Sequence, residues 1–288
     1  MPTPTSTRPH SLRLKDGRVI RFPAVMGILN VTPDSFSDGG CYLEPDRAVD
    51  HALAMEAAGA AIIDIGGEST RPAGAVAVAV EVEMERILPV IEALQMKLKV
   101  PISVDTRRAV VAGAALDEGA AIINDISALR HDPAMIALAA ETGCAVVLMH
   151  MRGGPTNHVR YARYRNVVAE VRDFLEGQAR AAVAAGVRRT RIIVDPGLGF
   201  AKNARHNLEL MGGLSEICAL GYPVLVGASR KRFVRAIAGG GEADLLFGNA
   251  AVNALAVAAG ASIIRVHDPG PMVAVVKMAV AIAKYSRG

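Results

Sequence analysis

One short frame of residues recurs along the chain and limits the fold more than any other feature. Gly59–Asp64, Gly119–Asn124 and Gly260–Arg265 each run from glycine through two small residues to a pair of isoleucines, and Gly143–Leu148 is a looser copy. An Ala-rich helical stretch precedes each glycine, which suits a left-handed helix end. A β-branched strand follows at once. Helix, glycine and strand in repetition are typical of βα units around a parallel sheet.

The same reading extended along the chain predicts eight strands. Eight βα units in 288 residues have the size of a single-domain α/β fold, the TIM (β/α)8 barrel. A doubly wound sheet is the alternative, but it would want a GxGxxG turn after its first strand, and none is present. The expected strands are Val25–Leu29, Ala61–Ile65, Ile102–Asp105, Ile122–Asp125, Ala145–His150, Ile192–Asp195, Val224–Ala228 and Ile263–His267.

Helical patterns fill the intervals between these strands. A short extra helix is expected over Arg232–Ala238, before a run of three glycines. The main helices are expected at Asp46–Ala58, Glu81–Leu98, Ala109–Glu118, Pro133–Thr142, Val167–Ala185, Asn207–Leu220, Gly248–Ala259 and Pro271–Tyr285.

The sequence predicts one domain that follows a short N-terminal tail. Residues 1–15 are polar and are expected to form a flexible N-terminal tail, with the barrel domain over residues 16–288. The tail has no apolar core of a signal peptide, and no apolar stretch reaches membrane-spanning length. Three dispersed cysteines without CxxC spacing indicate reduced thiols and a cytoplasmic protein.

Composition narrows the choice of partners. Hydrophobic residues make up 51% of the chain and charged residues 21%, which supports a large core and excludes a disordered protein. The net charge of +4 is scattered, without basic runs interleaved with aromatics, so we expect no nucleic-acid partner. A mild positive excess suits a small anionic substrate.

Polar residues end every expected strand, although the strands themselves are apolar. In a βα barrel the carboxyl ends of the strands form the active-site rim, so these residues are expected to converge. The strand-end residues are Asn30, Asp64, Asp105, Asn124, Asp125, His150, Asp195, Ser229, Arg230, Lys231, Arg265 and His267.

These residues sort by chemistry. Asp105, Asn124 and Asp195 offer carboxylates and an amide, which match a planar heterocycle rich in N–H donors. Cationic and hydroxyl groups near Lys231 and Arg265 suit phosphate oxygens. The neutral oxygen of Asn30 suits a hard cation such as Mg²⁺ that is held mainly by phosphate and water. The residues alone therefore predict a barrel enzyme for a phosphorylated heterocycle.

Other chemistries lack their motifs. The seven histidines show no HxH or HExxH spacing, which argues against a zinc site. No GxSxG elbow is present, so acyl-enzyme chemistry is not expected. His150 ends a strand, but a structural role is favoured for it over catalysis.

At these residues the sequence resembles dihydropteroate synthases, from about Val25 to Lys284. Eight segments, one at each strand end, follow in the order of that family. They are MGILNVTPDSFSDGG (26–40), DIGGESTRP (64–72), SVDT (103–106), NDI (124–126), LMHM (148–151), DPGLGF (195–200), SRK (229–231) and RVHD (265–268).

The resemblance implies a cytosolic homodimeric transferase of folate synthesis that joins p-aminobenzoate to 7,8-dihydropterin-6-ylmethyl diphosphate and releases pyrophosphate with Mg²⁺. It assigns catalysis to Asp105, Lys231 and Asn30, with Asn30 also contacting the metal. It assigns the pterin diphosphate to Thr70, Asp105, Asn124, Asp195, Lys231, Arg265 and His267. It assigns the p-aminobenzoate pocket, where sulfonamides bind, to Arg71, Pro72, Phe200, Ser229 and Lys231.

The chemistry that the resemblance implies agrees with the residues. A methylene on an electron-rich pterin can lose its diphosphate when negative potential stabilises the cation, which Asp105 would supply. We therefore expect an SN1-like path, with the first two loops closing to exclude water.

The sequence departs from the family in three places. One residue is inserted near Ala73, the segment Arg152–Arg165 is unusually basic, and Ala228 replaces a common Met. None of these removes an expected ligand, so activity is expected.

Two rival functions remain to be compared. A corrinoid-type methyltetrahydrofolate barrel would share the pterin pocket but has no use for the GGESTRP, SRK and RVH segments. A catalytically silent pterin-binding paralogue would be expected to lose Asn30, Thr70 or Lys231, and all are present. The closing helix Met272–Tyr285 is apolar on more than one face, which suggests a dimer.

Overall fold

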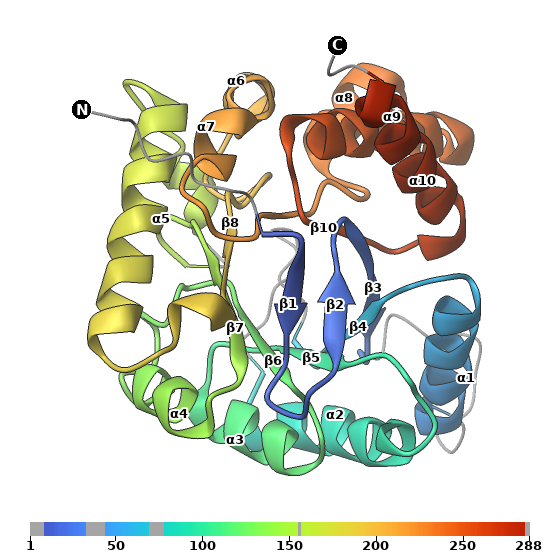
Figure 1. Ribbon diagram of the computed structural model, residues 1–288, viewed down its shortest axis with the longest axis vertical. Helices are drawn as coiled ribbons and strands as arrows, with labels where there is room; N and C mark the ends of the chain where they lie inside the picture. The colour runs from blue at the N-terminus through green and yellow to red at the C-terminus, as the bar shows by residue number, and fades with distance from the viewer. Residues whose placement is uncertain (1–8, 33–43, 69–77, 155–156, 286–288) are drawn as a thin grey trace.

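Eight parallel strands form one sheet that curls into a nearly closed barrel surrounded by helices (Figure 1). This computed structural model describes residues 9–32, 44–68, 78–154 and 157–285. Seven strands pair as neighbours in the order β8-β7-β6-β5-β4-β3-β10, and β9 continues from β10. A parallel bridge between Val194 and Val224 brings the ninth strand back to the eighth. The TIM barrel expectation is therefore confirmed, and the doubly wound alternative is excluded.

All eight predicted strands are present within a residue or two of their expected ends. β9 is the shortest, since only two residues of the expected segment pair as a strand. The strands are β3 (Ala24–Asn30), β4 (Ile62–Gly66), β5 (Ile102–Asp105), β6 (Ile122–Asp125), β7 (Ala145–Met149), β8 (Ile192–Asp195), β9 (Leu225–Val226) and β10 (Ile263–Val266).

The repeated glycines do what the sequence predicts. Gly59, Gly119 and Gly260 have φ of 97°, 107° and 110°, values that side chains disfavour. Gly260 also caps α9 with its backbone N–H, which donates to the carbonyl of Ala256. Each glycine lies in a connection of only three or four residues between helix and strand. This tight connection explains the regular spacing of the βα units.

Helices cover the outside of the barrel, and most match their expected ranges. Two differ. The expected helix Asn207–Leu220 is two helices, because the pair Gly212–Gly213 interrupts it, and α9 begins six residues before Gly248. The helices are α1 (Glu44–Ala57), α2 (Val80–Gln95), α3 (Ala109–Asp117), α4 (Ala134–Thr142), α5 (Val167–Ala184), α6 (Ala204–Gly212), α7 (Leu214–Cys218), α8 (Arg232–Ala238), α9 (Glu242–Ala259) and α10 (Pro269–Tyr285). Within the described residues, 3-10 helices lie at His158–Tyr161 and Arg189–Arg191.

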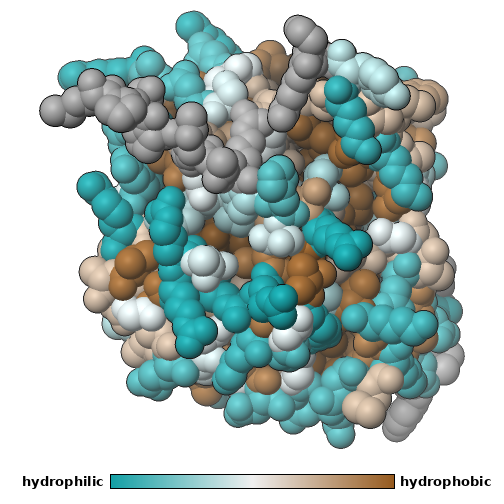
Figure 2. All heavy atoms as spheres, viewed as in Figure 1, coloured by the Kyte–Doolittle hydropathy of each residue, from teal (hydrophilic) through white to brown (hydrophobic). Residues whose placement is uncertain are grey.

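An antiparallel hairpin of β1 (Ser11–Arg13) and β2 (Val19–Arg21) lies in front of the barrel in Figure 1. It corrects the expected tail of residues 1–15, whose last part belongs to the folded domain. The hairpin was missed because its strands have only three residues each and bury one of them. Figure 2 shows hydrophilic residues spread over this face, with apolar ones visible between them.

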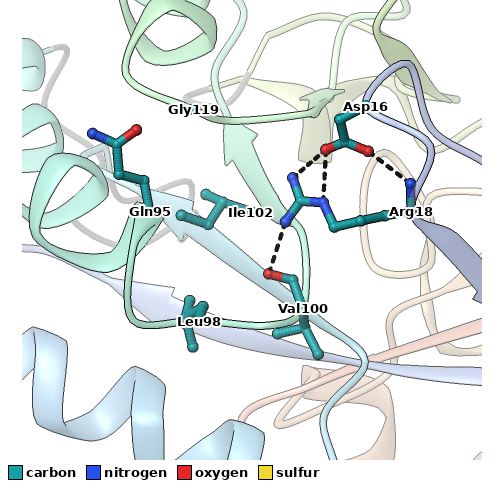
Figure 3. A pocket seen from close by; sticks show the side chains of 7 residues that line it. All are labelled: Asp16, Arg18, Gln95, Leu98, Val100, Ile102 and Gly119. Carbon is teal, nitrogen blue, oxygen red and sulfur yellow. Dashed lines mark hydrogen bonds and ion pairs between the residues drawn. The ribbon is translucent and has the colours of Figure 1, made fainter.

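The hairpin plugs the amino end of the barrel. Leu12, Leu14 and Ile20 are almost fully buried and belong to the same apolar cluster as the inward residues of the strands. Beside it, Arg18 donates to the carbonyl of Val100 over 3.2 Å and forms an ion pair with Asp16 (Figure 3). A small cavity of about 250 Å³ lies here. This end of the barrel is therefore closed by packing.

Two apolar layers hold the barrel together. The inner cluster contains Met26, Ile62, Ile122 and Ile193 from alternating positions of the strands, and the larger outer cluster joins the strands to the helices. Strands buried on both faces need nearly continuous apolar sequence, which explains the Ile and Val runs. In the described part of the chain no helix has the length and hydropathy needed to cross a membrane.

Candidate active site

A cavity of about 970 Å³ opens at the carboxyl ends of the barrel strands. It collects predicted residues from strands and loops that are far apart in sequence, so the expected common rim is confirmed. Thr70, Arg71 and Pro72 lie outside the described residues, as does the insertion near Ala73. The predicted residues that line the cavity are Asn30, Asp105, Asn124, Asp195, Phe200, Ser229, Lys231, Arg265 and His267.

Arg265 occupies the centre of the polar floor. Its Nε donates to Oδ2 of Asp64 over 2.6 Å, and its terminal nitrogen lies 2.7 Å from Oδ2 of Asp105. Burial disfavours the charged guanidinium, but the two carboxylates overcome this and raise the pKa of Arg265 above its ordinary value. Arg265 thus pairs with carboxyl groups from two different strands, β4 and β5.

Asp64 is a site residue that the sequence interpretation placed at a strand end but did not assign. It is fully buried, and its Oδ2 also accepts from the amide of Asn124 over 3.0 Å. Its other oxygen has no hydrogen-bond partner among the described residues. The register explains its position, because Asp64 pairs with Ser103 and so lies one inward-facing layer below Asp105. Asp64 therefore supports the groups that face the cavity.

Asp105 and Asp195 are carboxyl groups with shifted pKa values; the Asp105 side chain is 13% exposed, and Asp195 is buried. Burial raises the pKa of Asp105 to about 7 against the opposing effect of Arg265. Burial also raises the pKa of Asp195, while the N–H of Gly197, which donates to its Oδ1 over 2.7 Å, opposes the shift. Buried carboxyl groups are costly unless a partner satisfies them. Perturbed pairs of this kind in a cavity mark a binding or catalytic site.

Lys231 precedes α8 and projects toward the same carboxyl groups. Its pKa is lowered to about 8 by burial, with Asp195 opposing the shift. The ammonium lies 4.1 Å from the centroid of the Phe200 ring, a cation–π contact. Lys231 therefore joins the carboxyl groups on one side to an aromatic wall on the other.

A hydroxyl and an imidazole form a second polar group at the rim. The backbone N–H of His267 donates to Oγ of Ser229 over 3.2 Å, and Nδ1 of His267 lies 2.9 Å from the same oxygen. Between Ser229 and Lys231, Arg230 has a left-handed φ of 58° and an ion pair with Asp268 at 3.0 Å. A non-glycine residue in this conformation indicates a backbone held by its surroundings.

Asn30 ends β3 and lines the cavity. Among the residues that the structure describes, no group of three or more His, Cys, Asp or Glu side chains is arranged to hold a metal. A single amide oxygen fits a Mg²⁺ ion that takes most of its ligands from phosphate and water.

Ile126, Met149 and Phe200 form an apolar wall of the cavity, and of these three only Phe200 was predicted as part of the site. Ile126, Met149 and Met151 are buried and form a cluster with Phe200. Such a wall suits the face of a flat ring. Ile126, Met149 and Met151 lie in the NDI and LMHM segments, but no role was assigned to them because their side chains look like ordinary strand and loop hydrophobics.

His150 lies behind the cavity, as its predicted structural role requires. It is 2% exposed and packs edge-on against Phe174, with 4.8 Å between ring centroids. Burial, with the charge of Lys202 second, lowers its pKa to about 2, so the imidazole is neutral.

Fold and site together define a class of protein: a barrel enzyme that binds a flat, nitrogen-rich ring and an anionic group. The sequence matches the pterin binding enzyme family over residues 26–267. It is 50% identical to the dihydropteroate synthase of Mycobacterium leprae (strain TN) over 251 residues, 85% of this chain and 88% of that protein. The chain therefore belongs to the pterin-binding enzyme family, and within it to the dihydropteroate synthases.

Solved structures agree with this assignment. The Xanthomonas albilineans dihydropteroate synthase with 4-aminobenzoic acid has a TM-score of 0.88 and 43% identity, covering 95% of this chain and 98% of that one. The Yersinia pestis dihydropteroate synthase in a sulfonamide drug complex has a TM-score of 0.88 and 41% identity, covering 96% and 99%.

Proposed function

We propose that this enzyme condenses 7,8-dihydropterin-6-ylmethyl diphosphate with p-aminobenzoate to give 7,8-dihydropteroate and pyrophosphate, a pterinylmethyl transfer of folate biosynthesis. The observation that carries the proposal is one cavity that holds Asp105, Asn124 and Asp195 beside Lys231 and an apolar wall. The relatives described above are dihydropteroate synthases, and their similarity to this chain supports the proposal.

The pterin end of the cavity is assigned to the acids and the amide. Asp105 and Asp195 would accept hydrogen bonds from the ring N–H groups. The amide of Asn124 would form a further hydrogen bond along the same edge of the ring. A ligand that pairs with Asp105 takes over the contact that Arg265 makes there at 2.7 Å. Arg265 would then be released to stack on the flat ring, as a planar guanidinium can.

The diphosphate end is assigned to Arg265, His267 and Thr70. Asn30 would offer its amide oxygen to Mg²⁺, and when bound this ion supplies positive charge to the diphosphate oxygens. Cationic groups at this end favour the diphosphate as a leaving group because they stabilise the charge that it acquires.

The arylamine end is assigned to Phe200, Ser229 and Lys231, with Arg71 and Pro72. The ring of p-aminobenzoate would lie against Phe200, and its carboxylate would face the hydroxyl of Ser229 and neighbouring N–H donors. Because a sulfonamide occupies the related Yersinia pestis protein, we propose that sulfonamides bind here too.

The reaction would begin at the bond between the pterinylmethyl carbon and the diphosphate. That bond breaks with its electron pair on the diphosphate oxygen, and the carboxylate of Asp105 stabilises the positive charge left on the pterin. The nitrogen of p-aminobenzoate then forms the new bond to carbon and loses a proton. This SN1-like order needs a site from which water is excluded.

A pyrophosphate-release assay tests the proposal and separates the rivals. The purified enzyme should release pyrophosphate rapidly only when pterin diphosphate, p-aminobenzoate and Mg²⁺ are all present. Chelation of Mg²⁺ should abolish the release, and readdition should restore it. A silent paralogue would bind pterin without release. A corrinoid-type enzyme would not depend on p-aminobenzoate, and either result would overturn the proposal.

We propose that two copies of the chain pair through α9 and α10, which lie side by side (Figure 1). Both helices leave large apolar side chains exposed: 71% for Phe247 and 66% for Leu255 on α9, and 63% for Met278 on α10. On α10, Met278 and Ile282, which is 59% exposed, lie one turn apart and so share a face of that helix. An apolar face of this kind suits a self-complementary contact.

The mass measured by light scattering at micromolar concentration tests the dimer. Leu255→Glu should shift the enzyme toward the monomer, because it places a charge in the contact. Val110→Glu is the matched control, since Val110 is 57% exposed on α3, away from α9 and α10. A monomeric wild-type enzyme would contradict the proposal.

We also propose a cytoplasmic location. Cys144 and Cys218 are buried and free, which suits a compartment that keeps thiols reduced. Fractionation of cells followed by activity measurement checks this, and activity recovered with an extracytoplasmic fraction would contradict it.

A further inference from the structure

Lys202 is a buried cation that the proposed reaction does not use. It is 8% exposed and follows the DPGLGF segment after β8. Its Nζ lies 3.0 Å from the carbonyl oxygen of Gly197, 3.0 Å from that of Phe200 and 2.9 Å from Nδ1 of His150. The three N–H bonds of an ammonium therefore have three close acceptors, and the carbonyl of His150 adds a fourth at 3.5 Å.

The imidazole of His150 is built to accept from Lys202. A neutral ring with its proton on Nε2 presents a lone pair at Nδ1, and the low pKa of His150 keeps the ring neutral. Edge-on packing against Phe174 and a ring contact with Tyr164 fix its orientation. Burial lowers the pKa of Lys202, while the carboxylate of Asp195 opposes that shift. Nδ1 of His150 is thus a rigidly held acceptor for Lys202.

The loop from Gly197 to Lys202 wraps tightly around this ammonium. Gly197 has φ of 66°, and a Cβ there would lie 2.1 Å from the carbonyl oxygen of His150. Ala201 is also left-handed, with φ of 50°, and its N–H donates to Nδ1 of His158 over 2.9 Å. The N–H of Gly199 donates to the side chain of Asn207 over 2.7 Å. These contacts satisfy backbone N–H groups of the loop, whereas the carbonyls of Gly197 and Phe200 turn inward and need a donor, which Lys202 supplies.

The consequence appears at Phe200. Its carbonyl points at Lys202, and its ring lines the cavity, where it contacts the ammonium of Lys231 and the ring of His158, 5.4 Å away between centroids. We propose that Lys202 is a positioning residue for the arylamine end of the site: it gathers the carbonyls of Gly197 and Phe200 and so holds the Phe200 ring against the incoming p-aminobenzoate. The inference rests on the proposed synthase activity.

Lys202→Met tests this role, because it removes the donors and keeps most of the length of an unbranched side chain. We expect the KM for p-aminobenzoate to rise about tenfold, and the KM for pterin diphosphate to stay within about twofold. Lys97→Met is the control, since Lys97 is exposed at the far end of the barrel. A merely structural residue would raise both KM values together or lower kcat alone, and either result would overturn the inference.

Two variants of His150 carry the test if Lys202→Met does not fold. His150→Leu removes the acceptor and should raise the KM for p-aminobenzoate about threefold, whereas His150→Asn keeps an oxygen near Nδ1 and should stay closer to wild type. Equal KM values for p-aminobenzoate in His150→Leu and wild type would overturn the inference. The wild-type assay separates the two proposals: no pyrophosphate release by wild type means that the synthase proposal has failed, whereas release with unshifted variants means that only the role of Lys202 has failed.

Discussion

At the amino end of the barrel, Arg18 and Asp16 form an ion pair whose side chains are 35% and 40% exposed. At the carboxyl end, Arg265 pairs with Asp64 and Asp105 while its side chain is 20% exposed and theirs are 0% and 13%. Both are arginine–carboxylate contacts, and they lie at opposite ends of the barrel. Their surroundings make them physically different, because water screens the first pair and is largely excluded from the second.

The two ends also differ in how completely their polar groups are paired. The hairpin end is completed by apolar packing of Leu12 and Leu14, and its ion pair lies over that plug. The rim end keeps carboxyl groups that raise the cost of folding, and one oxygen of Asp64 lacks a partner within the described residues. Burying a charge without a full set of partners costs free energy, and such charges are typical of sites where a ligand supplies the missing partner. Binding function is therefore marked by buried, incompletely paired charge.

Replacement of Arg265 by Met should give the largest effect on stability. It leaves Asp64 and Asp105 buried without their cation, and a broken buried pair costs about 3 kcal/mol of unfolding free energy. The loss should be greatest near pH 8. The pKa of Asp105, already raised to about 7, rises further without Arg265, so at lower pH the carboxyl is neutral and needs no cation. Urea unfolding at several pH values measures this.

A smaller loss at high pH than at low pH would contradict that prediction, since it would mean that the carboxylates do not depend on Arg265. Arg18→Met is the matched control at the other end of the barrel, and its effect should depend little on pH.

Asp105→Asn should reduce kcat/KM by about a hundredfold, equivalent to about 2.7 kcal/mol. The change keeps the shape of the side chain and removes the charge that stabilises the pterin cation. Steady-state kinetics with both substrates varied measure it, with Asp16→Asn as the control at the hairpin end. A loss of much less than about tenfold would show that the proposed role of the carboxylate is wrong.

The barrel could be predicted because each strand obeys local rules. Glycine after an Ala-rich helix, two β-branched residues and a polar end recur, and the parallel architecture then forces the ends together. The separation of α6 from α7 was missed because the apolar pattern runs through Gly212–Gly213. The hairpin was missed because residues 11–21 form strands too short to show a period.

The site could be predicted only in part, because the depth of a strand residue below the rim depends on the register between strands. Asp64 and Asp105 look alike in sequence, as acids that close an apolar run. Pairing of Asp64 with Ser103 puts it beneath Arg265, and pairing of Gly66 with Asp105 puts Asp105 at the cavity. Lys202 was missed for a similar reason. A lysine in a loop is ordinarily solvated, and only the tertiary contacts with His150 and its own loop reveal that it is buried.

The dependence of kcat/KM on pH should show both titrating groups of the rim. Burial raises the pKa of Asp105 to about 7, and its carboxylate form accepts from the pterin, so kcat/KM should rise up to that pH. Burial lowers the pKa of Lys231 to about 8, and its ammonium form is the active one, so kcat/KM should fall above that pH. Outside this window the change should approach about tenfold per pH unit.

Kinetics with limiting pterin diphosphate at constant ionic strength give this profile. In Asp105→Asn the rising limb should disappear while the falling limb remains. A wild-type profile that is flat from pH 5 to pH 7 would contradict the assignment of the rising limb.

Arg18→Ala should give the smallest effect. The ion pair with Asp16 is partly exposed, and such pairs contribute less than about 1 kcal/mol. The hydrogen bond to the carbonyl of Val100 at 3.2 Å is lost as well, but that oxygen lies beside a small open cavity that water can enter. Kinetic constants should not change, because the pair lies at the far end of the barrel from the rim. Urea unfolding and steady-state kinetics of one preparation measure both, and a destabilisation as large as that of Arg265→Met would mean that burial does not distinguish the two ends.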